Sequence, residues 1–238
     1  MKRKKKLLYA LMATLLFTGC ATRSYVPRDR DLPPPKGKQD KNEQEWENIK
    51  RATRTSDPIF GKRKSKEKKP KLTIRVVLLD DNEYNRKYKL PGPFKKVTTI
   101  TIHNTANKVT AIEERNYLNN RRDNTSISFH YAVDEKEAIQ IMPLKTHAWH
   151  AGDGHGKGNM ESIAIEICRS THPDLKLYEK SEANAVILAA MLLKKYHLTT
   201  KDLRMHQDWS GKTCPHRIIE ANSWEDFKKR VAKTMKAL

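Results

Sequence analysis

The chain has 238 residues, with 48 basic and 28 acidic side chains, so its formal net charge is +20 at pH 7. That length accommodates one domain of ordinary size with appendages and excludes two large domains. Three cysteines are too few for a disulfide scaffold, and a hydrophobic share of 37% predicts that part of the chain contributes nothing to a core.

The amino terminus has the pattern of an export signal. Five basic residues, Lys2–Lys6, precede the apolar stretch Leu7–Phe17, and two small residues stand directly before Cys20. A stretch of about 11 apolar residues is too short for a bilayer span, which needs roughly 20. The segment resembles a bacterial lipobox, although Phe17 stands where the usual lipobox has an aliphatic residue. We expect residues 1–19 to be a lipoprotein-type signal peptide and Cys20 to be lipidated, which would make the protein an exported, membrane-anchored lipoprotein of the cell envelope. The alternative is a plain signal peptide with an incidental cysteine.

Residues 20–71 have the composition of a basic disordered tether. They contain Pro33–Pro35, few apolar residues and the mostly basic run Lys62–Lys69, so they cannot bury enough apolar surface to offset the entropy of ordering. A short helix near 43–51 is compatible with the pattern. The basic run could contact anionic lipid or wall polymer, or it could be a solvated spacer, and the sequence leaves both open.

The net charge is spread unevenly along the chain. The first 19 residues carry +5, and residues 20–71 carry +8 from 16 basic and 8 acidic residues. Residues 72–238 carry +7 from 27 basic and 20 acidic residues. Because a nucleic-acid-binding domain gathers its basic residues on a folded face, this distribution argues against a nucleic-acid partner.

Residues 72–238 change to short apolar runs between turn signals, which predicts a folded domain. Runs rich in β-branched residues predict strands over 71–79, 97–102, 126–133, 138–142 and 162–168. Apolar residues at helical spacing predict helices over 111–119, 181–196 and 223–235. Strands interleaved with helices predict an α/β domain with a central mixed β-sheet flanked by helices.

Two of the predicted strands have faces of different chemistry. Along 97–103, isoleucines occupy one face, while threonines and His103 occupy the other. Along 162–168, three isoleucines share one face, and Glu166 lies on the opposite face with a small residue on each side. The apolar faces are suited to packing against helices, and the polar faces are suited to a cleft. Spacing alone leaves open whether the two strands are neighbours.

Three residues have the chemistry of a zinc site. His103 ends a predicted strand, and His206 and Cys214 lie eight residues apart across a loop that contains Gly211. Catalytic zinc takes three protein ligands and leaves a fourth position to water. The spacing by itself is weak evidence, because a strand histidine is often a buried polar residue and a lone cysteine a small buried hydrophobe.

Five segments of the folded part occur in an order that resembles a known enzyme family. Together they look like the zinc-dependent N-acetylmuramoyl-L-alanine amidases of the phage-lysozyme and peptidoglycan-recognition-protein type, and most of all like the endolysin amidases of Gram-positive bacilli. The resemblance covers about residues 72–220 and implies a central mixed β-sheet flanked by helices, with zinc in a surface groove. The segments are Ile102–Asn107, Ser128–Asp134, Ala148–Gly154, Ser162–Cys168 and His206–Arg217.

The resemblance implies roles for five residues. His103, His206 and Cys214 are the expected zinc ligands, and zinc at such a site lowers the pKa of water from near 15.7 to about 7. Glu166 matches the family's catalytic glutamate, which moves a proton from water to the leaving amine; the alternative is a carboxylate that only orients a ligand. Lys212 matches a lysine that supports the tetrahedral intermediate, against the ordinary case of a solvated lysine.

Neighbouring positions refine this expectation. His150 lies in a loop that borders the substrate groove in relatives, where it would bind substrate or make a structural hydrogen bond within the loop. Phe129 stands where phage lysozyme has a catalytic tyrosine, and because it lacks a hydroxyl it shifts the base role to Glu166. His130 and Cys168 are expected to be structural.

The sequence therefore predicts a zinc amidase domain over 72–238 that uses zinc-activated water to cut the amide bond between N-acetylmuramic acid and L-alanine. Its expected partners are peptidoglycan or muropeptides and, through Cys20, a membrane, while the oligomeric state is open. A non-catalytic peptidoglycan-binding module of the same fold is one alternative; loss of the cysteine ligand would mark it, and Cys214 is present. A metal-free cysteine hydrolase that pairs Cys214 with His206 is another, and chelators would leave it active.

Overall fold

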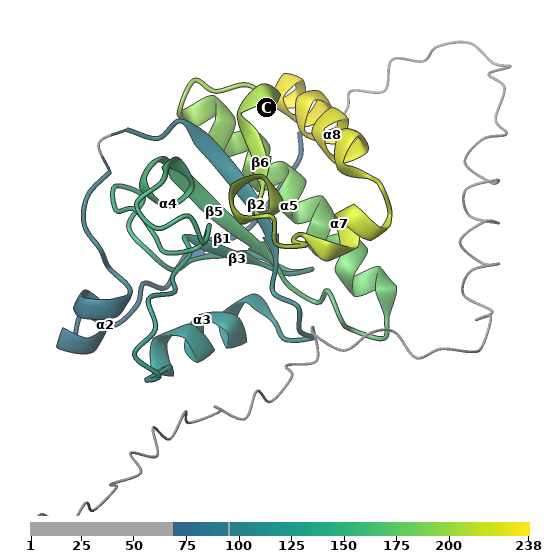
Figure 1. Cartoon of the computed structure of the whole chain (residues 1–238). Helices are drawn as coiled ribbons and strands as arrows, with labels where there is room; N and C mark the ends of the chain where they lie inside the picture. The colour runs from purple at the N-terminus through teal and green to yellow at the C-terminus, as the bar shows by residue number, and fades with distance from the viewer. Residues whose placement is uncertain (1–68, 95) are drawn as a thin grey trace, which may run out of the picture. The chain divides into compact units, whose positions relative to one another are not determined.

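The computed structural model describes residues 69–94 and 96–238 (Figure 1). The predicted signal peptide, Cys20 and the short helix near 43–51 lie outside the described residues, as does all of the predicted tether before Lys69. In the part of the chain that is described, no helix is long and apolar enough to cross a membrane.

A six-stranded sheet forms the centre of the domain, in the order β1-β4-β3-β5-β2-β6 (Figure 1). β3 and β4 pair antiparallel, and every other neighbouring pair is parallel. The predicted mixed sheet is therefore confirmed. The strands are β1 (Ile74–Val76), β2 (Thr99–Asn104), β3 (Tyr131–Val133), β4 (Ala138–Gln140), β5 (Ser162–Ile167) and β6 (Leu203–Met205).

Helices flank this sheet, as the sequence predicts. The long helix α5 follows β5, and α8 is the last element in the order. α3 lies between β2 and β3 in the sequence (Figure 1). The helices are α2 (Glu83–Tyr88), α3 (Ala111–Asn120), α4 (Lys157–Glu161), α5 (Leu175–Lys195), α6 (Gln207–Ser210), α7 (His216–Glu220) and α8 (Trp224–Ala237), with the 3-10 turn η2 (Thr200–Asp202).

The alternation along β2 and β5 is confirmed, and the sheet separates two hydrophobic clusters. The isoleucines of both strands are fully buried in one cluster, together with Leu193 of α5 and Phe227 of α8. On the opposite face, Ala164 of β5 packs in a second cluster with Leu118 of α3. α3 contacts β3 and β4, so it lies over that half of the second face, and the polar side chains of β2 and β5 occupy the other half.

The periodicity of the sequence did not predict the shortest elements, and it predicted a start for α5 that is six residues too late. β6 and the helices α2, α4, α6 and α7 have three to six residues each, too few for a period to show. α5 begins at Leu175 because the side chain of Asp174 caps it, accepting the N–H of Lys176 at 3.0 Å. The strand predicted over 126–133 contains only β3, since the N–H of Ser128 donates outside the sheet to the carbonyl of Trp149.

Asp134 ties α3 to the turn between β3 and β4. Its carboxylate is 2% exposed and accepts three backbone N–H groups, those of Ala111 at 2.9 Å, Lys136 at 2.8 Å and Glu137 at 3.0 Å. Ala111 is the first residue of α3, so one of these bonds satisfies a helix-end donor that has no partner within the helix.

We expect Asp134→Ala to lower the free energy of unfolding by about 3 kcal/mol, because three N–H groups lose a charged acceptor at a buried position. Asp81→Ala is the matched control, since Asp81 pairs with Arg86 at the surface and its loss costs about 0.5 kcal/mol or less. Urea denaturation of both variants measures the difference. Equal losses would contradict the structural role of Asp134.

Candidate metal and catalytic site

β2 and β5 are neighbours, which decides the question that spacing left open. They pair in parallel, and in their register His103 lies opposite Glu166. The Nδ1 atom of His103 and the Oε1 atom of Glu166 are 3.9 Å apart. Both residues occupy the second-last position of their strands, so they meet at the carboxyl end of the sheet, where α/β folds place their ligands.

β6 brings the second histidine to the same edge. It pairs in parallel with β2 on the side away from β5, and His206 follows directly after it, with its backbone N–H donating to the carbonyl of Ile102 at 3.3 Å. The Nδ1 atoms of His103 and His206 are 3.0 Å apart. The two imidazoles thus turn the same kind of nitrogen toward one point.

Cys214 returns to that point through a tight loop. After α6 the chain turns at Gly211, whose φ of 74° favours glycine, and the N–H of Gln207 donates to the carbonyl of Cys214 at 3.0 Å. The Sγ atom of Cys214 lies 3.9 Å from the Nδ1 atom of His103. It also accepts the backbone N–H of Asn104 at 3.4 Å, a bond that stabilises negative charge on the sulfur.

These three donor atoms fit a single tetrahedral zinc ion. All of them lie within 4.8 Å of one another. Zinc bonds of about 2.0–2.1 Å to nitrogen and about 2.3 Å to sulfur place two nitrogens about 3.3 Å apart and a nitrogen and a sulfur about 3.6 Å apart. The distances of 3.0 and 3.9 Å are close to these values. The sequence-predicted set His103, His206 and Cys214 could therefore hold a metal, and each residue is more than nine-tenths buried.

His150 contacts His103 on the side of the ring that faces away from His206. The Nδ1 atom of His150 is 3.0 Å from the Nε2 atom of His103, and its own Nε2 atom is 3.4 Å from the carbonyl oxygen of Ser162. A carbonyl only accepts, so the proton of His150 lies on Nε2 and its Nδ1 accepts from the Nε2–H of His103. That bond leaves the Nδ1 lone pair of His103 directed at the metal position. Both ring nitrogens of His150 thus have protein partners, which favours a role in orienting the ring of His103. The predicted contact of His150 with substrate stays a prediction.

Burial keeps these imidazoles neutral. Removal from water lowers the pKa of His103 well below its ordinary value, and the neighbouring imidazoles and the positive charge of Lys212 lower it further. Burial likewise lowers the pKa of His150. A metal binds the neutral imidazole, so the fold provides His103 in its ligand form at neutral pH.

Glu166 and Lys212 are the more accessible members of the site. The side chain of Glu166 is 16% exposed, against 2% for His103. Lys212 is exposed two residues before Cys214, in the loop that follows α6. An accessible carboxylate and an accessible cation next to one metal position suit proton transfer and stabilisation of negative charge, respectively.

Trp209, which the sequence analysis did not single out, holds α6 against the sheet. Its Nε1–H donates to Thr101 Oγ1 at 3.0 Å, and Thr101 Oγ1 lies 2.6 Å from Ser162 Oγ. Its indole also presses on Gly158, where a Cβ atom would come within 2.8 Å of Trp209 Cγ. A tryptophan inside the His206–Cys214 segment was the available sequence signal, although its partner on β2 was not readable from spacing.

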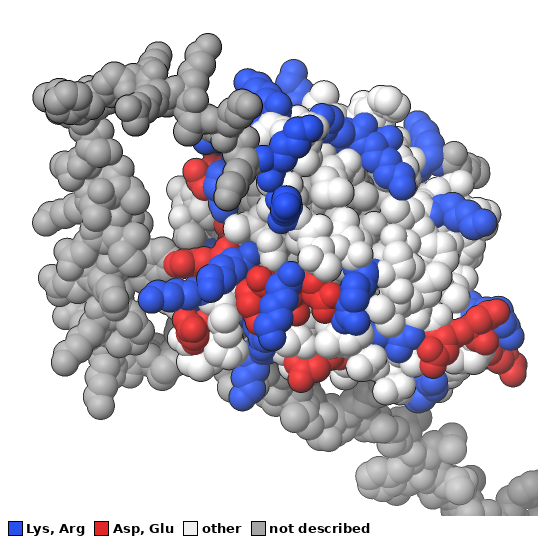
Figure 2. Space-filling view, turned by 180° about the vertical axis from the view of Figure 1, so that it is seen from behind, with Lys and Arg blue, Asp and Glu red and all other residues white. Residues whose placement is uncertain are grey.

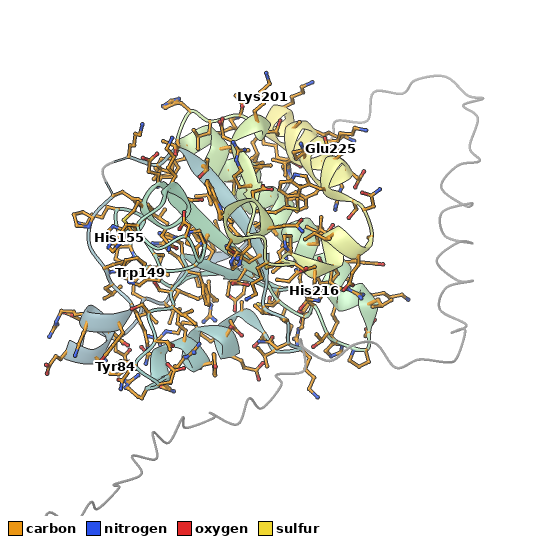
Figure 3. All side chains as sticks on the ribbon, viewed as in Figure 1. Tyr84, Trp149, His155, Lys201, His216 and Glu225 are labelled. Atoms are coloured by element: carbon orange, nitrogen blue, oxygen red, sulfur yellow. The ribbon has the colours of Figure 1, made fainter. Side chains whose placement is uncertain are left out.

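Asn159 fixes the loop that carries His150. Its Oδ1 atom accepts the N–H groups of His150 at 2.7 Å and Ala151 at 2.8 Å, and its Nδ2 donates to the carbonyl of Gly154. The rings of Trp149 and His155, which lie on either side of His150 in the chain, pack edge to face with centroids 5.4 Å apart (Figure 3). This loop, which has glycine at every second position from 152 to 158, is therefore ordered by the buried side-chain amide of Asn159.

The remaining expectations concern residues near the site. His130 is structural, as predicted: its Nδ1 accepts the N–H of Ala164 at 3.0 Å, its Nε2 lies 2.8 Å from the carbonyl of Thr146, and burial lowers its pKa to about 4. Burial raises the pKa of the Cys168 thiol well above its ordinary value, so this cysteine is held as an inert thiol. Phe129 is 5% exposed and packs in the second core cluster.

Comparison with known proteins identifies the family. The family profile described as N-acetylmuramoyl-L-alanine amidase matches residues 93–217. This chain belongs to the N-acetylmuramoyl-L-alanine amidase family. The matched range contains all three candidate ligands together with Glu166 and Lys212.

Individual amidases support this assignment. The amidase CwlA of Bacillus subtilis (strain 168) is 41% identical over 170 residues, which cover 70% of this chain and 60% of CwlA. XlyB of the same organism is 47% identical over 137 residues, which cover 57% of this chain and 42% of XlyB. The chain thus spans less than two thirds of these curated relatives.

Solved structures share the fold. The structure of PlyL has a TM-score of 0.62 and 41% identity and covers 67% of this chain and 97% of PlyL. The solution structure of the PlyG catalytic domain has the same TM-score at 40% identity and covers 69% of this chain and 96% of that domain. The predicted fold class is therefore confirmed by these structures as well as by the sheet.

We expect His150→Ala to weaken the affinity of this candidate site for zinc by about 10- to 100-fold, because His103 loses the acceptor that fixes its ring. His150→Asn should recover part of the loss, since its Oδ1 atom can take the place of Nδ1. His155→Ala, an exposed position on the same loop, is the control. Competition with a chromophoric chelator measures the affinities. Unchanged zinc affinity with a raised KM would assign His150 to substrate binding instead.

Proposed function

We propose that this protein is a peptidoglycan hydrolase that cleaves the amide bond between N-acetylmuramic acid and the L-alanine of the stem peptide. The observation that carries the proposal is the convergence of two imidazoles, one thiol and the Glu166 carboxylate at a single edge of the sheet. Membership of the amidase family supports the reaction class. The complete ligand set, with Cys214 in place, favours catalysis over a binding-only module.

Zinc is the metal that we propose for the site. Two imidazoles and a thiolate in tetrahedral reach of one point are typical of zinc among the first-row metals. Bound zinc supplies a Lewis acid for the scissile carbonyl and lowers the pKa of water to about 7.

The chain's own residues account for the proton transfers and for stabilisation of the developing negative charge. Glu166 accepts a proton from the attacking water as the water oxygen bonds to the lactyl carbonyl carbon. The same carboxyl group then gives that proton to the alanine nitrogen as the C–N bond breaks, which releases a carboxylic acid and an amine; at neutral pH the acid passes its remaining proton to the amine. Lys212 offsets the negative charge that develops on the carbonyl oxygen. Phe129 has no hydroxyl to share this work.

We expect Glu166→Gln to lower kcat by about 10²- to 10⁴-fold while zinc content stays stoichiometric, because the amide retains the shape but cannot take the proton. Glu179→Gln, at an exposed position of α5, is the matched control. Turnover of muropeptides and metal analysis of the same preparations provide the two readouts. Near-normal turnover would remove Glu166 from the proposed role.

Digestion of purified peptidoglycan with and without chelator tests the reaction itself. We expect free stem peptides with an L-alanine amino terminus, found by mass analysis, only when metal is present, and restored activity on addition of zinc. His103→Ala and Cys214→Ser should lose the metal, because each removes one of three protein ligands. Full activity in chelator would favour the cysteine hydrolase, and binding to peptidoglycan without any release would favour the binding module.

For the amino-terminal segment, we propose export followed by lipidation of Cys20, which would give the amidase a membrane as its second partner. The pattern Lys2–Lys6, Leu7–Phe17 and Cys20 supports this proposal. Acyl labelling that disappears in Cys20→Ser, together with release of that variant from the membrane fraction, is the expected result. Unchanged fractionation would leave a plain signal peptide as the explanation.

A further inference from the structure

The net positive charge of the folded part is concentrated in two short stretches. Residues 194–204 and 229–238 contain eight basic residues and one acidic residue, whereas the whole of 72–238 contains 27 basic and 20 acidic residues. The remainder of the domain therefore holds 19 basic and 19 acidic residues and is neutral overall. The charge of +7 that the sequence assigned to the domain as a whole belongs to one part of it.

These two stretches meet in space. α8 contacts both α5 and η2, and the Nζ atom of Lys194, near the end of α5, donates to the carbonyl of Met235 on α8 at 3.4 Å. Lys201 belongs to η2, the 3-10 turn that α8 contacts (Figures 1 and 3). In the view from behind, basic side chains crowd the upper part of the molecule, which holds these elements (Figure 2). We call this surface the basic face; it consists of Lys194, Lys195, Lys201, Arg204, Lys229, Lys233 and Lys236.

The lysines of α8 in the basic face lie on the exposed side of that helix. The three lysines of α8 are four and three residues apart, so they line one side of the helix, while Phe227 and Val231 on the other side are fully buried in the core. Arg230 is excluded from the basic face, because it pairs with Asp226 at 2.7 Å and with Glu182. The single acidic residue of the two stretches, Asp202, accepts the N–H of Thr199 at 2.8 Å and so serves the cap of η2.

The basic face and the catalytic site lie at opposite ends of the sheet. The site is at the carboxyl ends of the parallel strands β5, β2 and β6. α5 follows β5 and runs back, so its last residues reach the amino ends of those strands, and η2 leads directly into the start of β6. Whatever holds the basic face therefore leaves the catalytic end directed away from it.

We propose that the basic face binds the surface of an anionic lipid bilayer and orients the catalytic site away from that bilayer. Six of its seven residues are lysines, and all six are exposed. Lysine acts as a point charge on a flexible stem, without the planar fork with which arginine grips one phosphate, so this array suits a diffuse layer of headgroups. Each lysine that reaches such a layer raises the partition coefficient by about fivefold. The proposal does not depend on the proposed hydrolysis.

The test compares two full-length variants with the same net charge. Lys195, Lys201, Lys229 and Lys236 are changed to Gln in the first variant, and Lys108, Lys136, Lys176 and Lys180, exposed lysines elsewhere in the domain, are changed to Gln in the control. Both variants keep residues 1–71, so any contribution of that segment is equal. Cosedimentation with vesicles of phosphatidylglycerol and phosphatidylcholine measures partitioning, and pure phosphatidylcholine vesicles are the neutral reference.

The basic-face variant should bind the anionic vesicles at least about tenfold more weakly than the control variant, with unchanged melting temperature and unchanged turnover of a soluble muropeptide. Added salt should remove the difference between the two variants. Equal loss in both variants would show that only total charge matters and would overturn the proposal. Equal vesicle binding with loss of binding to purified cell walls in the basic-face variant alone would overturn it as well, in favour of a wall polyanion.

Discussion

The parallel pairing of β5, β2 and β6 is the constraint on which the site depends. Parallel strands bring their carboxyl ends to one edge, and here those ends carry Glu166, His103 and His206. Register matters as much as direction, because a slip of one residue would turn Glu166 to the face that holds the isoleucines. The full burial of those isoleucines against α5 and α8 therefore keeps the carboxylate on the side of the ligands. Core packing and site geometry are thus two consequences of one pairing.

Hydrogen bonds then decide which atoms face the metal position. The carbonyl of Ser162 can only accept, so it sets the proton of His150, which in turn makes the Nε2 atom of His103 a donor. The thiol ligand is placed by Asn104, whose backbone N–H donates to the sulfur and whose Oδ1 accepts the N–H of Arg217 at 3.0 Å. These bonds lie at buried positions, where the local dielectric is low and a misplaced polar group is costly. The candidate ligands are consequently held in place by hydrogen bonds of the protein itself.

The same topology separates the two ends of the domain. A helix that follows a parallel strand must return to the other end of the sheet before the next strand begins, and α5 makes this return between β5 and β6. The loops at the carboxyl ends are free to carry ligands, whereas the helix ends at the amino edge are free to carry charge. Composition follows this division, since the excess of basic residues in the folded part falls on α5, η2 and α8. A single domain can in this way present a reactive end and a docking end without interference between them.

The sequence by itself determined the fold class and the two-faced character of β2 and β5, because alternation and residue chemistry are local properties. The resemblance that names the candidate ligands, Glu166 and Lys212 is likewise carried by short segments. Only the tertiary structure decided that β2 and β5 are neighbours, that His150 contacts His103 rather than open space, and that Trp209 and Asn159 hold the loops. It also decided that two basic stretches far apart in the chain form one surface. These facts depend on contacts between residues separated by tens of positions, and such contacts are set by strand order and core packing, which no local pattern encodes.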